Sequence, residues 1–402
     1  MRVYDRVVAR YRLLAISLLV ACRGGFDQLP GAGIDADVVG DMFMPTVDSP
    51  PVPALSPLTC TGGAVAESIQ VDNPDAMVAI GTDRGFAVFT ANQMGEVRGW
   101  TFDVNNGALV RIADNVLLDS NSTGMTTVGF DGTHILLANV IGGISPTGTH
   151  LHVLDTAILS DVVPMMTSST FSVRNGVTKN ANTSGFAYVT QGPTTAAMLH
   201  TLDDSGHETG SAATIIPDPE SADNISIIPV NSQYAATYIA NAASPPVVRA
   251  FLLDASFAPV GGAVSPSTGI DNVHTPALAY CPSGNDFIVA WTDKDATGMD
   301  QVFYATLDST LATTKAATSI ATMSNTPADI EIPGAFWLSW LDYNTGKVES
   351  AVIDGSGTAT PYPIANTGWP YWDVMTKHAD QSVLIWNVSG TTGNLLFQPY
   401  CP

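Results

Sequence analysis

The hydrophobic and polar positions of this chain follow one pattern that recurs seven times. In each copy an apolar stretch ends in a polar turn, and a second apolar stretch follows the turn. Six copies then reach an acidic residue, with successive gaps of 52, 48, 51, 54 and 46 residues, at Asp103, Asp155, Asp203, Asp254, Asp308 and Asp354. The last large residue of the first stretch keeps nearly the same step, at Phe89, Ala138, Val189, Tyr238, Trp291, Trp340 and Trp386. Short apolar stretches bounded by turn residues predict β-strands, and no long stretch after residue 60 has the period of an amphipathic helix.

A fixed period near 50 residues in an all-β chain predicts a β-propeller, which is a ring of four-stranded blades. The seven copies predict seven blades within residues 59–402. The alternative is a row of β-sandwich domains or a two-sheet β-helix. A sandwich domain would repeat at about 100 residues, which favours the propeller.

The two ends of the repeat predict how the ring closes. Six copies are followed by a candidate fourth strand, and the seventh is not, because only Cys401 and Pro402 follow it. An unassigned apolar segment over 63–70 precedes the first copy. We expect this segment to pair with the last strand as its missing neighbour. Antiparallel pairing would bring Cys60 and Cys401 together, which predicts a disulfide that clamps the ring and stabilises it by about 4–5 kcal/mol. Two free surface thiols are the alternative, and Cys281 is expected to be a small buried hydrophobe.

Residues 1–21 have the composition of a secretory signal. Four arginines and one aspartate precede a short apolar segment over 13–21, which is too short to span a membrane comfortably. The segment ends in Leu19-Val20-Ala21-Cys22, which resembles the lipobox of bacterial lipoproteins. The resemblance implies cleavage before Cys22, acylation of Cys22 and attachment to a membrane of the cell envelope through this lipid anchor. A plain secretory signal with a nearby cleavage site is the alternative.

Residues 22–58 change in character after the lipobox. Between 23 and 58 they contain six prolines and five aspartates with no steady hydrophobic period, which predicts a disordered, extended tether. Acidic tethers of this kind resemble those of myxobacterial-type envelope lipoproteins. Residue 23 is arginine rather than the aspartate that tends to keep lipoproteins of enteric bacteria in the inner membrane. We therefore expect the outer membrane, with the propeller facing the periplasm or the surface.

The charge balance excludes one class of partner. The chain has 15 Lys and Arg against 37 Asp and Glu, and removal of residues 1–21 takes away four arginines and one aspartate, which leaves 11 against 36 and a net charge of −25. A surface of this charge repels a phosphate backbone, so we expect no nucleic-acid partner. Anionic lipid would also repel it, and membrane attachment then rests on the acyl anchor.

One turn has the spacing of oxygen ligands for a calcium ion. Asp293, Asp295, Thr297 and Asp300 surround a glycine that permits a sharp bend, and several oxygens in one turn suit Ca²⁺. The segment resembles the calcium hairpins of integrin-type propellers, although it has threonine at the fifth position and occurs in one blade only. A solvated polar hairpin turn is the alternative, and no other cofactor is expected.

Two further motifs carry weaker signals. His150 and His152 alternate along one predicted strand and share a face, as two metal ligands do, but the sequence names no third ligand. Residues 342–347 read Asp-Tyr-Asn-Thr-Gly-Lys and resemble part of the tryptophan-docking repeat of quinoprotein propellers. No tryptophan follows this segment, and an ordinary Asn-Thr-Gly turn explains it better.

Large aromatic residues are concentrated toward the end of the chain. Trp369, Tyr371 and Trp372 surround a proline in the link into the seventh blade. Exposed aromatic residues of this kind are typical of recognition surfaces, so these three are candidate binding residues. Packing in the core is the alternative.

Motifs of well-known catalytic sites are absent from the sequence. It contains no Gly-x-Ser-x-Gly elbow, no phosphate-binding loop and no His-Glu-x-x-His motif. We therefore predict a non-catalytic binding or scaffold protein whose propeller face recognises an envelope protein or a glycan. The alternative is an extracytoplasmic enzyme, either a lactonase or a glycan-active hydrolase, with its active site at the mouth of the channel.

Overall fold

The computed structural model describes a large part of the predicted propeller region. The described residues are 65–68, 74–92, 94–105, 108–141, 148–168, 171–180, 185–191, 196–216, 222–267, 274–294, 297–322, 324–365, 370–379, 381–388 and 394–401. They belong to one compact unit, and none of them lies in a helix that is long and apolar enough to cross a membrane. The signal, Cys22 and the tether lie outside the described residues, so what the sequence predicts for them stays a prediction.

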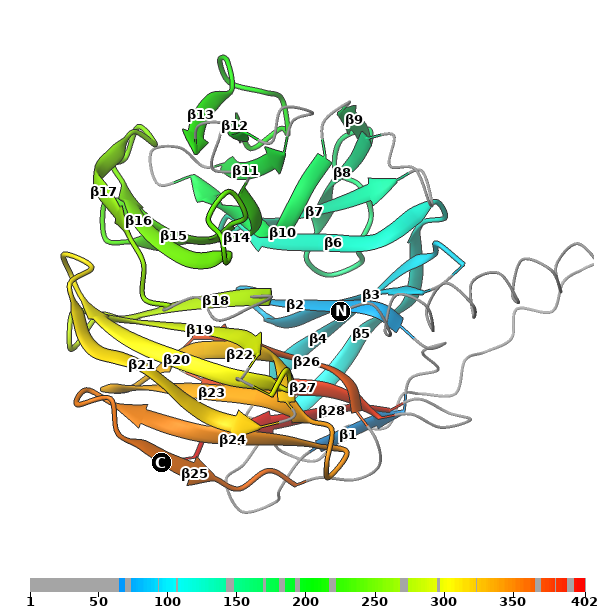
Figure 1. Cartoon of the computed structure of the whole chain (residues 1–402). Helices are drawn as coiled ribbons and strands as arrows, with labels where there is room; N and C mark the ends of the chain where they lie inside the picture. Colours follow the sequence, from blue (N-terminus) through cyan, green and yellow to red (C-terminus); the bar gives the residue numbers. More distant parts are fainter. Residues whose placement is uncertain are drawn as a thin grey trace, which may run out of the picture. The chain divides into compact units, whose positions relative to one another are not determined.

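The described strands form seven antiparallel sheets of four strands each, and each sheet is one blade (Figure 1). Blade one contains β2 (Pro74–Gly81), β3 (Gly85–Asn92), β4 (Val97–Asn105) and β5 (Ala108–Asp119). Blade two contains β6 (Ser122–Phe130), β7 (His134–Ile141), β8 (Gly148–Asp155) and β9 (Met166–Ser168). Blade three contains β10 (Phe171–Asn180), β11 (Gly185–Gln191), β12 (Ala197–Leu202) and β13 (Ala213–Ile216).

The remaining blades repeat this order. Blade four contains β14 (Ala222–Val230), β15 (Gln233–Ala240), β16 (Val247–Leu253) and β17 (Pro259–Val264). Blade five contains β18 (His274–Cys281), β19 (Asp286–Lys294), β20 (Asp300–Asp308) and β21 (Thr313–Thr322). Blade six contains β22 (Ser324–Ile332), β23 (Ala335–Asp342), β24 (Lys347–Asp354) and β25 (Ala359–Tyr362). Blade seven contains β26 (Pro370–His378), β27 (Gln381–Val388), β28 (Asn394–Pro399) and β1 (Val65–Ser68).

The blades form a closed ring. The first strands of successive blades contact one another in the cycle β2, β6, β10, β14, β18, β22, β26 and back to β2. The ring is completed by β1, which pairs antiparallel with β28 so that Val65 lies opposite Phe397. The seven-bladed propeller closed by an N-terminal strand is therefore confirmed. Cys60 lies outside the described residues, so the disulfide with Cys401 stays a prediction.

The recurring aspartate has a structural explanation in the turn between the third and fourth strands. In blade four, the Asp254 carboxylate accepts the backbone N–H groups of Ser256 and Ala258 at 2.8 and 2.9 Å, and Phe257 has a φ of 65°. This is a three-residue hairpin loop whose last position is left-handed. The same acceptor pattern, on the second and fourth residues after the aspartate, recurs at Asp203, Asp308 and Asp354.

The core consists of blade faces packed against one another. Along β3, Phe86 and Val88 pack against blade seven, whereas Ala87 and Phe89 pack against blade two. Because successive side chains of a strand point to opposite faces and both faces are buried, such strands read as continuous apolar runs. Trp100, Trp291, Trp337 and Trp386 are the largest side chains that are fully buried among the described residues.

The two sequence markers differ in how faithfully they follow the strand register. Asp103 pairs with Gly85 and Asp308 pairs with Asp286, so the acidic marker holds one position in the repeat. The first-strand marker does not, because Phe89 is four residues after Gly85, whereas Trp291 is five residues after Asp286. A residue at the fourth position and one at the fifth point to opposite faces of the strand. Either position can carry the last large apolar residue, because both faces of the strand are buried.

Candidate functional site

One end of the ring gathers the side chains that can carry chemistry. The first strand of a blade begins beside the turn between the second and third strands, as the pairing of Ser122 with Ile141 and of Ser324 with Asp342 shows. The fourth strand of the preceding blade ends there as well, because it leads directly into that first strand. We name this end of the ring the hairpin face. Blade two and blade six each carry a group of polar side chains on it.

The blade-two cluster consists of Asp119, His150, His152 and Asp161. Asp119 is the last residue of β5, and the two histidines alternate on β8, which places them on one face as the sequence predicts. The Asp119 Oδ2 atom lies 2.7 Å from His150 Nδ1 and 3.8 Å from His152 Nε2. On the other side of its ring, His152 Nδ1 lies 3.1 Å from Asp161 Oδ1. Asp119, His150 and His152 therefore converge from two blades, and Asp161 contacts the far side of the His152 ring.

Hydrogen bonds fix the orientation of Asp119 within this cluster. Asn139 Nδ2 donates to Asp119 Oδ2 at 2.8 Å, and Ser122 Oγ donates to Asn139 Oδ1 at 2.6 Å. The backbone N–H groups of Ser120 and Asn121 donate to the other carboxylate oxygen at 2.7 and 3.3 Å. The Oδ2 atom is thereby directed at the two imidazole rings.

Burial makes the electrostatics of the cluster strong. The side chains of His152 and Asp119 are 2% and 7% exposed. Burial lowers the pKa of His152, but its contacts with Asp119 and Asp161 outweigh this and raise the pKa to about 9. Burial likewise opposes ionisation of Asp119, yet its contacts with His152, Asn139 and His150 hold its pKa well below the usual range. The Nε2 atom of His152 is buried and has no hydrogen-bond partner.

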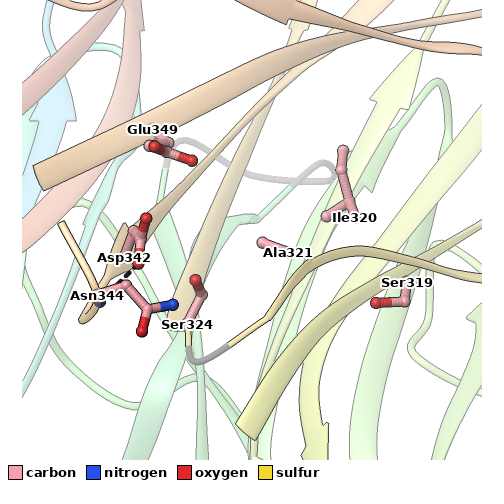
Figure 2. A pocket seen from close by; sticks show the side chains of 7 residues that line it. All are labelled: Ser319, Ile320, Ala321, Ser324, Asp342, Asn344 and Glu349. Atoms are coloured by element: carbon pink, nitrogen blue, oxygen red, sulfur yellow. Dashed lines mark hydrogen bonds between the residues drawn. The ribbon is translucent and has the colours of Figure 1, made fainter.

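The blade-six pocket lies on the same face of the ring and has a volume of about 410 Å³. Figure 2 shows Asp342, Asn344 and Ser324 on one side of the pocket and residues 319–321 of β21 on the other. Glu349, on β24, completes the lining. The pocket therefore combines hydroxyl, amide and carboxylate groups around an open volume.

The two carboxylates of the pocket are not equivalent. Burial, followed by the neighbouring charge of Asp342, raises the pKa of Glu349. Asp342 is held by its own turn, because its carboxylate accepts the Asn344 N–H at 2.7 Å and the Thr345 hydroxyl at 2.9 Å. These bonds confirm the ordinary turn expected for 342–347. Tyr343, in the same turn, is 52% exposed.

The predicted calcium turn is the hairpin between β19 and β20. Asp293 is buried and Asp300 is partly exposed, but the Lys294 ammonium lies 3.4 Å from Asp300 Oδ1 and 3.4 Å from the Gly298 carbonyl. A side-chain cation therefore already contacts oxygens of this turn. Thr297 is exposed, and Asp295 lies outside the described residues, so calcium binding stays a prediction.

The candidate aromatic residues are only partly described. Trp372 is half-buried on β26 and packs against the core cluster between blades seven and one, which includes Met77 and Phe397. Trp369 lies outside the described residues, and so does the side chain of Tyr371. Trp372 thus contributes to packing, and the binding surface proposed for this segment stays a prediction.

Sequence reasoning found two members of the blade-two cluster and missed the others. The alternation of His150 and His152 shows in the sequence, but Asp119 belongs to the preceding blade, 31 residues before His150. Its position at the end of a long fourth strand is the available signal, because that end meets the next blade. No single motif marks the blade-six pocket, because its residues come from four strands (β21, β22, β23 and β24) and one turn. The segment 342–347 supplies only two of them, Asp342 and Asn344.

Comparison with known proteins supports the fold. No protein-family model and no curated protein sequence matches the chain. A chain in a crystal structure of the mitotic checkpoint complex aligns with a TM-score of 0.51 and 12% identity, over 93% of this chain and 100% of that chain. The SapL1 lectin in complex with alpha methyl fucoside aligns with a TM-score of 0.44 and 12% identity, over 74% of this chain and 99% of the lectin.

An enzyme also aligns with part of the chain. The alpha-L-arabinofuranosidase from Lactobacillus brevis aligns with a TM-score of 0.33 and 11% identity, over 54% of this chain and 87% of the enzyme. At these identities the likenesses concern the fold and indicate neither a ligand nor a reaction. Function must therefore be argued from the residues of the hairpin face.

Proposed function

We propose that this protein is an envelope-anchored, non-catalytic binding protein that recognises a glycan at the hairpin face of its propeller. The observation that carries the proposal is the blade-six pocket, an open volume of about 410 Å³ lined by Ser319, Ser324, Asp342, Asn344 and Glu349. Sugar hydroxyls both donate and accept hydrogen bonds. Carboxylates accept them, and hydroxyl and amide groups do both, so the lining suits a polyhydroxylated ligand.

Two features sharpen the expected ligand class. Tyr343 is exposed and lies in the turn between two lining residues, Asp342 and Asn344, and an amphipathic aromatic ring at the edge of the pocket would suit the apolar face of a sugar. Two carboxylates in the lining, on a strongly acidic chain, disfavour sulfated and uronic acid sugars. We therefore expect neutral or amino sugars.

The proposed anchor rests on the lipobox. Acylation of Cys22 would hold the propeller at the outer membrane, and the acidic tether would let the hairpin face reach ligands away from the lipid. Replacement of Cys22 by serine should release the protein from the membrane fraction and remove the acyl mass from its N-terminal peptide. Retention of the C22S protein in the membrane fraction would refute the anchor without affecting the binding proposal.

The binding proposal is tested with the detergent-solubilised full chain on a glycan array, followed by calorimetry with each hit. Asp342→Asn should weaken binding at least about tenfold, because it removes an acceptor from the pocket. Asp204→Asn is the matched control, since Asp204 is an exposed aspartate in the turn between β12 and β13, at the opposite end of a blade. No binding by the wild type, or equal binding by both variants, would overturn the proposal. A stoichiometric protein cross-linked in the envelope would then direct attention to a protein ligand.

A second candidate function is glycan hydrolysis, which one observation favours. Asp342 and Glu349 line the same pocket, and Glu349 is the carboxyl with the raised pKa, as a general acid beside an ionised partner requires. Incubation of array hits with the protein, followed by product analysis, separates the two functions. Product release that Glu349→Gln abolishes while binding persists would establish the enzyme.

A further inference from the structure

We propose that Asp119, His150 and His152 bind one divalent transition-metal ion, and we expect zinc. The three residues offer ligand atoms that all lie within 4.8 Å of one another. They form the one such group found among the residues that the structure describes. The proposal is independent of the glycan pocket, which lies in another blade.

The donor set and spacing fit such an ion. Two imidazole nitrogens and one carboxylate oxygen are typical ligands of zinc, and three protein ligands leave a position open for water or substrate. Zinc bonds of about 2.0–2.1 Å in a tetrahedral arrangement place the ligand atoms about 3.3 Å apart. The observed separations from Asp119 Oδ2, 2.7 Å to His150 and 3.8 Å to His152, lie on either side of that value. Side-chain shifts of roughly half an ångström would equalise them.

The surroundings of His152 match those of a metal ligand. Histidine ligands generally donate their second ring N–H to a carboxylate, and His152 Nδ1 lies 3.1 Å from Asp161 Oδ1. With that proton on Nδ1, the Nε2 lone pair faces the carboxylate of Asp119. Nε2 is buried and has no hydrogen-bond partner, so a metal ion between Nε2 and Oδ2 would give this nitrogen the partner that it lacks.

Charge balance supports the same conclusion. When His152 is neutral, as a metal ligand must be, the buried Asp119 and the 35% exposed Asp161 contribute two negative charges, which one divalent ion neutralises. The side chains of His152 and Asp119 are almost fully buried, and an uncompensated charge there would be costly. The His150 side chain is 16% exposed, so the site has contact with solvent through which an ion and a fourth ligand could enter.

Metal binding is tested on the full chain in detergent, after removal of bound metal with EDTA and dialysis. Zinc titration by calorimetry and elemental analysis after gel filtration should give one ion per chain. Cobalt substitution should give the visible absorption of a tetrahedral site with nitrogen ligands. Asp161→Asn should retain the stoichiometry but weaken affinity about 10–100-fold.

Single-ligand variants identify the site. His150→Gln and His152→Gln should each lose the bound ion. His200→Gln should keep it, because His200 lies on the third strand of blade three with Glu208 at 3.1 Å and stands outside the cluster of possible metal ligands. Circular dichroism checks that each variant is folded. If His152→Gln does not fold, the proposal is tested by the zinc stoichiometry of His150→Gln, whose side chain is partly exposed, and by the cobalt spectrum of the wild type. Less than about a tenth of an ion per wild-type chain, or full stoichiometry in His150→Gln, would overturn the proposal.

Discussion

Blade two and blade six place different chemistry at the same position of the hairpin face. His150 pairs with Asn139, two residues before the end of β7, and Glu349 pairs with Trp340, two residues before the end of β23. The difference comes from the strand before each blade. β5 ends in Asp119, which fills the space in blade two with a charged contact, whereas the uncharged residues Ser319, Ile320 and Ala321 of β21 line an open pocket in blade six. One position of the fold thus serves as a filled charge cluster in one blade and as a pocket in another.

The two regions also differ in what the fold does to a carboxylate. The pKa of Asp119 is lowered, so the folded protein stabilises its charged form, whereas the pKa of Glu349 is raised, so the fold disfavours the charge. A carboxylate with a raised pKa in an open pocket is typical of a binding or catalytic site. Removal of each charge should therefore change stability in opposite directions.

The largest expected effect is that of Asp119→Ala. The change leaves His150 and Asn139 without their shared acceptor and removes the carboxylate 3.8 Å from His152 Nε2, and loss of one partner from a buried charged group costs about 3–5 kcal/mol. The free energy of unfolding, measured by denaturant titration in EDTA, should fall by about 3 kcal/mol.

Asp114→Ala is the matched control for that change. Asp114 lies on the same strand, is 56% exposed and pairs with Arg111 at 2.8 Å, so its removal should cost no more than about 0.5 kcal/mol. Equal losses in the two variants would show that the blade-two cluster is no stronger than a surface ion pair.

A pH titration of stability should show the next largest effect. The pKa of His152 is about 9 in the folded metal-free protein and about 6.5 in the unfolded chain, so the folded state binds the proton more tightly. The resulting stabilisation is fully present below pH 6.5 and is lost as the pH rises to 9, by about 3 kcal/mol. His152→Gln should flatten this part of the pH profile, whereas a wild-type profile that is already flat would contradict the interpretation of the cluster.

These two regions also show what the sequence could predict. The acidic residues predicted the blades because Asp203, Asp254, Asp308 and Asp354 accept backbone N–H groups of their own turns, and a local interaction of this kind leaves a periodic signal. The ring closure was predictable because β1 has no partner near it in the chain. Asp119 and the β21 wall of the pocket were not predictable, because the contact between blades depends on where a fourth strand ends and on which side chains reach across.

Tyr343→Ala should separate recognition from stability in the blade-six pocket. Tyr343 is 52% exposed, so its loss should change the free energy of unfolding by less than about 0.5 kcal/mol. Glycan affinity should fall about tenfold, which corresponds to about 1.4 kcal/mol, because the stacking surface is lost. Met94→Ala is the matched control, since Met94 is 72% exposed in the β3–β4 turn of the same face. The glycan affinity of this variant should equal that of the wild type. Equal affinities in the two variants would remove the tyrosine from the binding site.

The smallest expected effect tests whether the fold disfavours the ionised form of Glu349, in contrast to that of Asp119. Glu349 is an acid whose folded pKa is raised, so its ionisation weakens the folded state as the pH rises above its ordinary value of 4.5. Glu349→Gln should therefore match the wild type below that pH and exceed its stability at pH 7 by about 0.3 kcal/mol, a small gain because the group is partly solvated. Denaturant titrations of both proteins at pH 4 and pH 7 measure the difference. If Glu349→Gln were less stable than the wild type at pH 7, the pocket would stabilise the ionised carboxylate of Glu349, as the blade-two cluster stabilises that of Asp119. The proposal that Glu349 is a general acid with a raised pKa would then be wrong.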